Sequence, residues 1–120
     1  MTRGDIYMAN LPKIGGSVQH GLRPVLILQN DIGNRHAPTV IVAPVTLQHK
    51  TNIPTHVQLA NNSLLVFDRA LYRTLCQSWI IFEQIMTADK KVLGDKVAKT
   101  DILPDMEKAV MVALGIGGLV

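Results

Sequence analysis

Residues 21–46 read GLRPVLILQNDIGNRHAPTVIVAPVT, in which two apolar runs are separated by a polar stretch. The apolar run from Pro24 to Gln29 predicts a strand. Pro24 is compatible with it only near the start of the strand or on an edge. The run from Thr39 to Val45 predicts the next strand, and the polar residues from Asn30 to Pro38 predict the turn between them. The centre of the fold is therefore expected to be a β-sheet.

The same alternation of short apolar runs and turn residues continues on both sides of this stretch. Before it, Gly4 to Ala9 predicts a strand, and the glycine-containing segment from Asn10 to Gly21 predicts a long loop. After it, a polar loop from Thr46 to Pro54 precedes a further strand from Thr55 to Leu59. Gln77 to Met86 again has the composition of a strand.

Two segments have the apolar spacing of helices. The first is expected from Ser63 to Leu75, with Asn62 or Ser63 as its N-cap. The second lies near the end of the chain, where Asp101 can cap a helix whose first turn contains Pro104. A mainly β fold with helices (α+β) is therefore predicted, built as a small SH3-like or OB-like barrel that a C-terminal helix covers.

Length and composition predict one folded domain, residues 1–120, because the chain has 120 residues of which 48% are hydrophobic. The lone cysteine, Cys76, cannot form an internal disulfide, which suits a reducing compartment. No export signal is expected, since Met1 to Asp5 carries mixed charges, and no apolar run approaches the ~18 residues that cross a membrane. These features predict a soluble, cytoplasmic protein.

The positive charge is concentrated in the first half of the chain. The net charge is +3, but residues 1–60 carry five Lys/Arg against two acids, whereas residues 61–120 carry seven of each sign. All four histidines also lie in the first half. A polyanionic partner, if the protein has one, is therefore expected to bind there.

Several kinds of functional site are disfavoured by what the sequence lacks. His49 and His56 are separated by Pro54, a spacing that suits neither a helix face nor a tight chelating turn, so a zinc site is not expected. Gly15-Gly16 is interpreted as a flexible turn rather than a nucleotide-binding loop. No pair of acids stands out in the first half, so two-metal phosphoryl chemistry is not expected.

Arg23 and Thr46 are the remaining candidates for chemistry. Arg23 is expected where a glycine-rich loop meets a strand, and its planar guanidinium can bind a phosphate through two hydrogen bonds. Thr46 ends a strand, where its hydroxyl can position a phosphate or a proton. From pattern alone, a solvated arginine and a threonine bonded to its own backbone remain the more ordinary interpretations. The stretch from Trp79 to Phe82 is likewise interpreted as core rather than as a base-stacking platform.

Several stretches resemble the MazF/PemK family of toxins. An uninterrupted string such as Gly21 to Asn34 is far more specific than a short motif. The resemblance is carried by Arg3 to Tyr7, Gly15 to Asn34, Ala37 to Ala43, Thr46 and Gln48, and Pro54 to Val57, with a weaker similarity at Glu83 to Ile85, Thr87, Asp89 and Lys90.

This resemblance implies an SH3-like barrel, a homodimer and a metal-independent endoribonuclease that cleaves single-stranded RNA in a sequence-selective way. Attack by the 2′-OH would leave a 2′,3′-cyclic phosphate and a 5′-OH. The resemblance also implies a cognate antitoxin whose C-terminal segment occupies the RNA groove. The family's catalytic arginine falls on Arg23 and its catalytic threonine on Thr46. The residues that would hold the RNA are Ser17, Gln19, His20, Gln48, His49 and Lys50.

Departures from the family pattern leave alternatives open. The segment from Asn61 to Cys76 looks inserted or remodelled, and Met86 stands where many members carry an arginine. One alternative is a gyrase-poisoning toxin of the CcdB kind, although such toxins end in Trp-Gly-Ile and this chain ends in Gly117 to Val120. The other is a catalytically weakened module that binds RNA or the antitoxin, which is favoured if Met86 has disabled the site.

Overall fold

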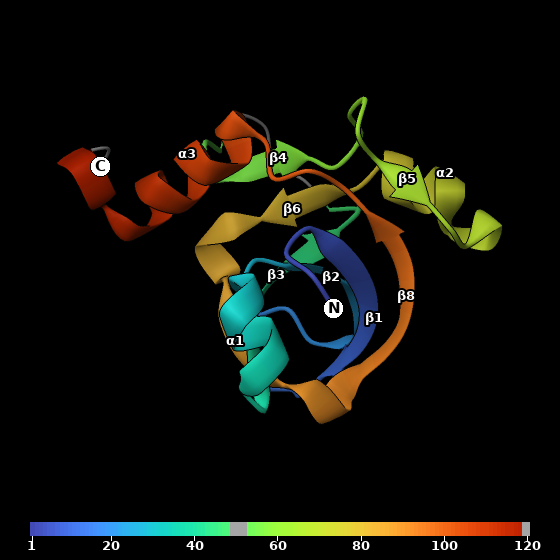
Figure 1. Ribbon diagram of the computed structural model, residues 1–120. Coiled ribbons are helices and arrows are strands. Elements are labelled where there is room, and N and C mark those ends of the chain that lie inside the picture. Colours follow the sequence, from blue (N-terminus) through green and yellow to red (C-terminus); the bar gives the residue numbers. More distant parts are fainter. Residues whose placement is uncertain (49–52, 119–120) are drawn as a thin grey trace.

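The computed structural model describes residues 1–48 and 53–118, and an antiparallel sheet forms its centre (Figure 1). The strands are β1 (Asp5–Leu11), β2 (Gly21–Ile27), β3 (Thr39–Thr46), β4 (His56–Gln58), β5 (Leu65–Val66), β6 (Trp79–Ile81), β7 (Met86–Asp89) and β8 (Leu93–Lys99). They pair in the order β4-β6-β3-β2-β1-β8-β5, and β7 pairs with the first half of β3. The sheet curls into a barrel. The barrel stays open because β4 and β5, at the two ends of this order, do not pair with each other.

Short helices connect the strands, and one longer helix follows them. Figure 1 shows α3 lying beside β4 on one side of the barrel, while α2 lies beyond the other end of β6. The helices are α1 (Asp31–His36), α2 (Tyr72–Cys76) and α3 (Pro104–Leu114), with 3₁₀ turns η1 (Arg69–Leu71), η2 (Phe82–Gln84), η3 (Lys90–Val92) and η4 (Ile116–Gly118).

The central strands bury side chains on both of their faces. Along β2, Leu26 packs into one apolar cluster while Val25 and Ile27 pack into a second, as the alternation of side chains along a strand requires. The first cluster continues under α3 through Met106 and Ala109. Burial on both faces explains why this part of the sequence is a continuous apolar run rather than an alternating one.

Most strand predictions are confirmed within one to three residues, and Pro24 occupies the kind of position predicted for it. Strand β2 begins at Gly21, earlier than expected, so that Arg23 lies inside the strand and not at its junction with the loop. Pairing of β2 with β3 begins only at Val25. Pro24 is therefore paired with β1 alone and borders an edge on its other side. The strand expected from Gln77 to Met86 is shorter, because β6 ends at Ile81 and η2 follows.

Three local predictions are wrong. The turn expected from Asn30 to Pro38 contains helix α1, which Asn30 caps by accepting a hydrogen bond from Gly33 N at 2.8 Å. The helix expected from Ser63 to Leu75 is replaced by β5, η1 and α2, because Leu65 and Val66 pair with β8 instead. Asp101 does not cap α3, whose N-cap is Leu103 without a side-chain hydrogen bond.

The two departures from the family pattern have defined places in this fold. The segment from Asn61 to Cys76 adds β5 to the edge of the sheet and buries Leu75 in the first cluster. Met86 pairs with Val42 and packs its half-buried side chain against the second cluster. Its apolar side chain therefore contributes to packing in the barrel.

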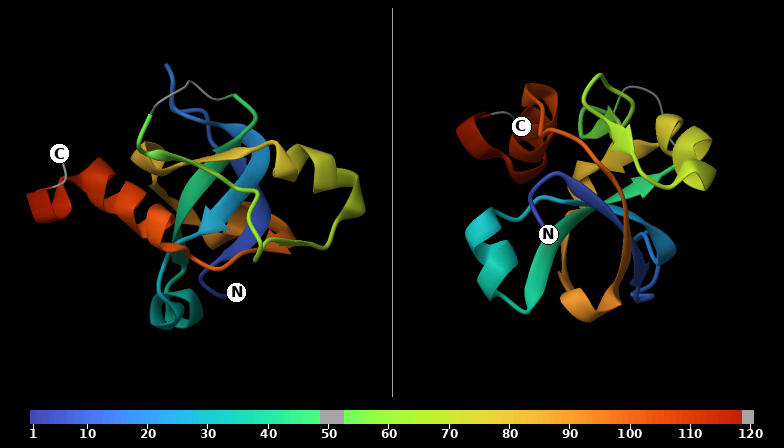
Figure 2. Two further views of the ribbon diagram at one scale, coloured as in Figure 1. Left: turned by 90° about the horizontal axis from the view of Figure 1, so that it is seen from above. Right: turned by 45° about the vertical axis from the view of Figure 1, so that its right-hand side comes forward.

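The loop between β1 and β2 lies at the same end of the barrel as the C-terminal end of β3. In the left view of Figure 2 this end is opposite α1 and the N-terminus. Within residues 1–48 and 53–118, no helix combines the length and the apolar character that crossing a membrane requires.

Candidate functional site

A pocket of about 330 Å³ opens where β2 and β3 separate. The two strands pair up to Val25 and Pro44, after which β3 pairs with β6 through Val45 and Thr46. The residues of β2 that precede Val25 therefore pair with β1 but not with β3, and the two strands β2 and β3 diverge there in a fork. The pocket is lined by Gln19, Leu22, Arg23, Pro24, Val45, Thr46, Leu47, Gln48, Thr74 and Ser78.

Arg23 is half-buried in the wall of this pocket. Its Nε donates a hydrogen bond to the carbonyl oxygen of His20 at 2.9 Å, and its Nη1 donates to Oε1 of Gln19. Partial burial lowers the pKa of the Arg23 guanidinium from its ordinary value, although arginine stays charged in proteins. Among the described residues Nη2 has no hydrogen-bond partner, so that the outer edge of the guanidinium remains available to an anion.

Thr46, at the end of β3, lines the same pocket as Arg23. Its side chain is buried, with 9% of the residue exposed, and its Oγ1 accepts a hydrogen bond from Gln48 N at 3.1 Å. The sequence left open whether this threonine bonds its own backbone or serves chemistry. It accepts a hydrogen bond from the backbone and also lines the pocket that Arg23 lines.

A second hollow, of about 470 Å³, adjoins this pocket. Gln19 and Gln48 line both, so that the two form one groove, which we call the Arg23 groove. The second hollow is rich in groups that donate or accept hydrogen bonds. Its lining consists of Ser17, Gln19, Gln48, Ile53, His56, Ile81, Glu83 and Gln84.

Five of the predicted site residues come together in the Arg23 groove. Its lining includes Arg23, Thr46, Ser17, Gln19 and Gln48. His20 contributes its carbonyl oxygen to Arg23, while its exposed ring contacts Val18 O through Nδ1 at 3.2 Å. His49 and Lys50 fall outside the described residues.

The sequence analysis missed a hydrogen-bonded cluster in the second hollow. The carboxylate of Glu83 accepts a hydrogen bond from Thr55 Oγ1 at 2.7 Å and contacts His56 Nε2 at 2.8 Å. Partial burial acts to raise the pKa of Glu83, but these bonds outweigh it, and the pKa lies below its ordinary value. All three residues stand in stretches that carry the family resemblance, which is the signal that could have identified them.

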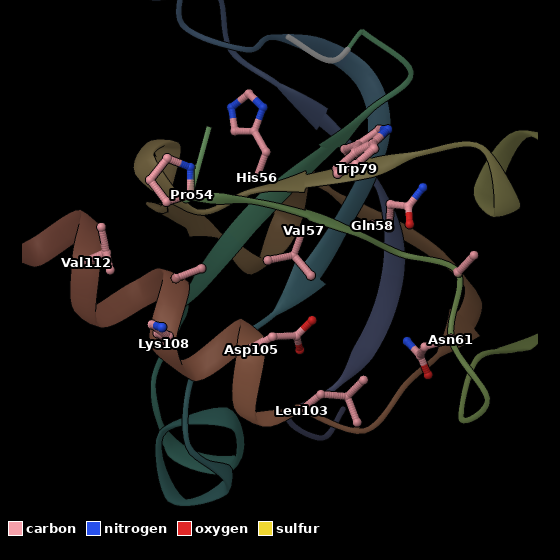
Figure 3. Close-up of a pocket in the computed structure, with 12 residues that line it drawn as sticks. Pro54, His56, Val57, Gln58, Asn61, Trp79, Leu103, Asp105, Lys108 and Val112 are labelled. Atoms are coloured by element: carbon pink, nitrogen blue, oxygen red, sulfur yellow. The ribbon is translucent and has the colours of Figure 1, made fainter. Parts of the chain in front are cut away.

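Another cavity, of about 450 Å³, lies between α3 and β4 (Figure 3). Figure 3 shows Asp105 and Lys108 on the helix and Val57 and Gln58 on the strand, with Trp79 at the upper edge. Neither Arg23 nor Thr46 lines this cavity. The half-buried Trp79 borders it, while Ile80 and Phe82 are buried in the core as predicted.

Comparison with known families gives a match over nearly the whole chain. Residues 2–113 match the model of the PemK-like, MazF-like toxins of type II toxin–antitoxin systems. The chain belongs to this toxin family. The protein is also similar to the endoribonuclease EndoA of Bacillus subtilis, with 42% identity over 117 residues that cover 95% of this chain and 94% of EndoA.

Solved structures of two endoribonucleases have the same fold as this chain. An endoribonuclease from a mycobacterial species superposes with a TM-score of 0.72 at 25% identity, covering 98% of this chain and 93% of that chain. A second mycobacterial endoribonuclease, in complex with its cognate antitoxin, has a TM-score of 0.70 at 26% identity and covers 96% of this chain and 95% of that chain. The expected CcdB/MazF-like, SH3-like barrel is confirmed.

Proposed function

We propose that this toxin is an endoribonuclease that cuts single-stranded RNA in the Arg23 groove. The observation that carries the proposal is that Arg23 of β2 and Thr46 of β3 both line one pocket of about 330 Å³. The membership in a toxin family and the 42% identity to the endoribonuclease EndoA support RNA as the substrate. The 120 residues would act as one toxin domain.

The proposed reaction uses a nucleophile that RNA carries itself. The 2′-oxygen next to the scissile phosphate forms a new bond to phosphorus while the bond to the 5′-oxygen breaks. The 2′-OH loses a proton and the 5′-oxygen gains one, so that the products are a 2′,3′-cyclic phosphate and a 5′-OH. Because RNA supplies the nucleophile, the protein has to orient the phosphate and stabilise the added negative charge.

Arg23 would stabilise that charge. Its Nε and Nη1 are held by His20 and Gln19, which directs the rest of the guanidinium at the pocket. Thr46 would hold or orient a phosphate oxygen through its hydroxyl. Since Arg23 supplies a permanent positive charge, we propose that cleavage needs no metal ion.

RNA on either side of the cut would be held by polar groups of the two loops that border the groove. Ser17, Gln19 and Gln48 present backbone and amide groups to the second hollow. A hollow of about 470 Å³ with such a lining suits a nucleobase that is turned out of a single strand. We propose that His20, His49 and Lys50 add further contacts to the RNA.

The partners that we propose are a cognate antitoxin and a second copy of the chain. A mycobacterial relative forms a complex with its cognate antitoxin. We propose that a cognate antitoxin also binds this toxin and that the antitoxin's C-terminal segment occupies the Arg23 groove. The exposed side chains of Ile41 and Leu114 line one mainly apolar hollow, and this is the surface on which we expect the homodimer to form. We propose that the protein works in the cytoplasm, where its RNA substrate would be found.

A modified substrate tests the proposed chemistry. In a single-stranded RNA with one mapped cut, the 2′-OH that precedes the cut bond is replaced by hydrogen. We expect cleavage at that bond to cease and cleavage of the unmodified RNA to leave a cyclic phosphate. Unchanged cleavage of the bond that follows the 2′-deoxy nucleotide, or products with a 5′-phosphate, would contradict the proposal.

A further inference from the structure

The 3₁₀ turn η2 forms a rigid support beside the Arg23 groove. Phe82 is 0% exposed and Ile81, just before the turn, is 3% exposed. The backbone N–H of Phe82 donates to Thr55 O at 3.0 Å, which ties the turn to the start of β4. Gln84, the last residue of η2, therefore extends from backbone that is fixed by the core.

The side-chain amide of Gln84 bridges from this support to the loop between β1 and β2. Its Oε1 accepts a hydrogen bond from Gln19 N at 2.8 Å, and its Nε2 donates to Ser17 O at 3.2 Å. This pattern uses the acceptor and a donor of the amide at once, so that it also fixes which way the amide faces. The two bonded residues lie more than sixty positions away in the sequence.

The loop that Gln84 holds has little support of its own. Residues 12–20 lie outside the strands, and the regular structure among them is a single turn at Gly16 and Ser17. Gly15 and Gly16 have positive φ angles, and a Cβ at either would meet no atom within 4 Å. A loop of this kind has several accessible conformations, and ordering it costs conformational entropy.

The same loop sets the position of the guanidinium. Gln19, whose backbone N–H is bound by Gln84, offers its side-chain oxygen to Arg23 Nη1. The next residue, His20, accepts the bond from Arg23 Nε at 2.9 Å. The contacts thus run from the core through Gln84 and the loop to Arg23.

We propose that Gln84 is a positioning residue for Arg23, which it holds in place through residues 17–20. This inference rests on the proposed function, in which Arg23 binds the scissile phosphate. Gln84 acts by limiting the conformations of the loop that carries the two acceptors of Arg23. Its loss should therefore affect turnover more than the binding of RNA.

The first experiment removes both hydrogen bonds and preserves side-chain length. In Gln84→Met we expect kcat to fall roughly 10- to 100-fold, as displacement of a catalytic group by about 1 Å does, with a smaller change in KM. The matched control is Gln77→Met, the same substitution at an exposed residue that follows α2. It should leave kcat within about twofold of the wild-type value.

The second experiment reads the position of Arg23 without RNA. In a ¹⁵N NMR spectrum of the unmodified protein, the Nε–H of Arg23 should be shifted and exchange slowly, because it is bonded to His20 O. In Gln84→Met this signal should move toward the position of a free arginine and exchange faster, while the remaining backbone spectrum is preserved. This readout is independent of catalysis, so that it separates a failure of the present inference from a failure of the proposed function.

A further variant covers the possibility that Gln84→Met does not fold. Gln84→Glu keeps an oxygen that can accept from Gln19 N, but it replaces the donor to Ser17 O by an acceptor. Its kcat and its Arg23 signal should therefore lie between those of the wild type and of Gln84→Met. An unchanged Arg23 signal in a folded Gln84 variant, or a loss of activity confined to KM, would overturn the inference.

Discussion

At the scale of single residues, Arg23 owes its position to the separation of β2 from β3. The sequence located an arginine near a strand end, but from the pattern alone a solvated side chain was the more ordinary interpretation. The pocket beside Arg23 favours a functional arginine over a merely solvated one. This pocket opens at the fork before Val25, where β3 changes its pairing partner from β2 to β6. Pairing between distant strands is not encoded in the residues near Arg23, so only the family resemblance pointed to its role.

The hydroxyl of Thr46 can be tested apart from its methyl group. Thr46→Val removes the hydroxyl at nearly constant volume, and we expect the cleavage rate to fall roughly 10²-fold if the hydroxyl contacts the phosphate. Thr46→Ser keeps the hydroxyl, which accepts from Gln48 N, and should stay within about tenfold of wild type. Single-turnover rates on one RNA check both, and equal activity of the Val and Ser variants would refute a role for the hydroxyl.

The carboxylate of Glu83 is expected to make stability depend on pH. Because the pKa of the folded state lies below the ordinary value of 4.5, the ionised form contributes stability above that pH. The contribution is lost as the pH falls from 4.5 toward the pKa of the folded state. Thermal unfolding of Glu83→Gln should therefore differ most from wild type at about pH 7 and converge with it in acid.

The control for this series is Asp95→Asn, at an exposed acid in β8. It should show no comparable convergence. A difference between Glu83→Gln and wild type that stays constant down to acidic pH would mean that the hydrogen bonds from Thr55 and His56 do not stabilise the charged form.

At the scale of elements, strands with both faces buried were the easiest to predict. The runs in β2 and β3 are long, apolar and β-branched, and few other structures accommodate them. The segment from Ser63 to Leu75 was harder, because its apolar spacing matches a helix. Leu75 is buried in the first cluster, but Phe67 is 52% exposed, since the edge of β8 recruits Leu65 and Val66 into the sheet. Tertiary pairing here overrides the local pattern.

The start of β1 depends on a glycine that no other residue can replace without strain. Gly4 has a φ of +98°, its N–H donates to Ile27 O at 2.8 Å, and a Cβ there would lie 2.3 Å from Thr100 O. Gly4→Ala should destabilise the protein by clearly more than the roughly 1–2 kcal/mol that left-handed backbone costs an alanine, because the added Cβ would also clash with Thr100 O.

Urea unfolding measures this effect, with Gly16→Ala as the control. Gly16 also has a positive φ, of +59°, but open space around it, so its substitution should cost only about 1–2 kcal/mol. Equal losses in the two variants would show that the contact with Thr100 does not matter.

At the scale of the whole molecule, the Arg23 groove is assembled from segments that are far apart in the sequence. The β1–β2 loop, the end of β3, the end of α2 and the turn η2 each contribute side chains. The excess of positive charge lies in residues 1–60, the half of the chain that contains Arg23 and Thr46. It could not indicate Glu83 or Gln84, because they reach the groove only through the register of β6 with β3 and β4.

The central claim is that Arg23 drives RNA cleavage without a metal ion. The most direct measurement compares the wild-type protein with Arg23→Ala on a long single-stranded RNA in excess EDTA. The control is Arg35→Ala, which removes the same charge from α1 at the opposite end of the barrel (Figure 2).

We expect the wild-type and Arg35→Ala proteins to cut the RNA at the same bonds and at rates that EDTA does not change. Arg23→Ala should be slower by about 10²- to 10³-fold. Loss of wild-type cleavage in EDTA, or an Arg23→Ala protein as active as the wild type, would contradict the account.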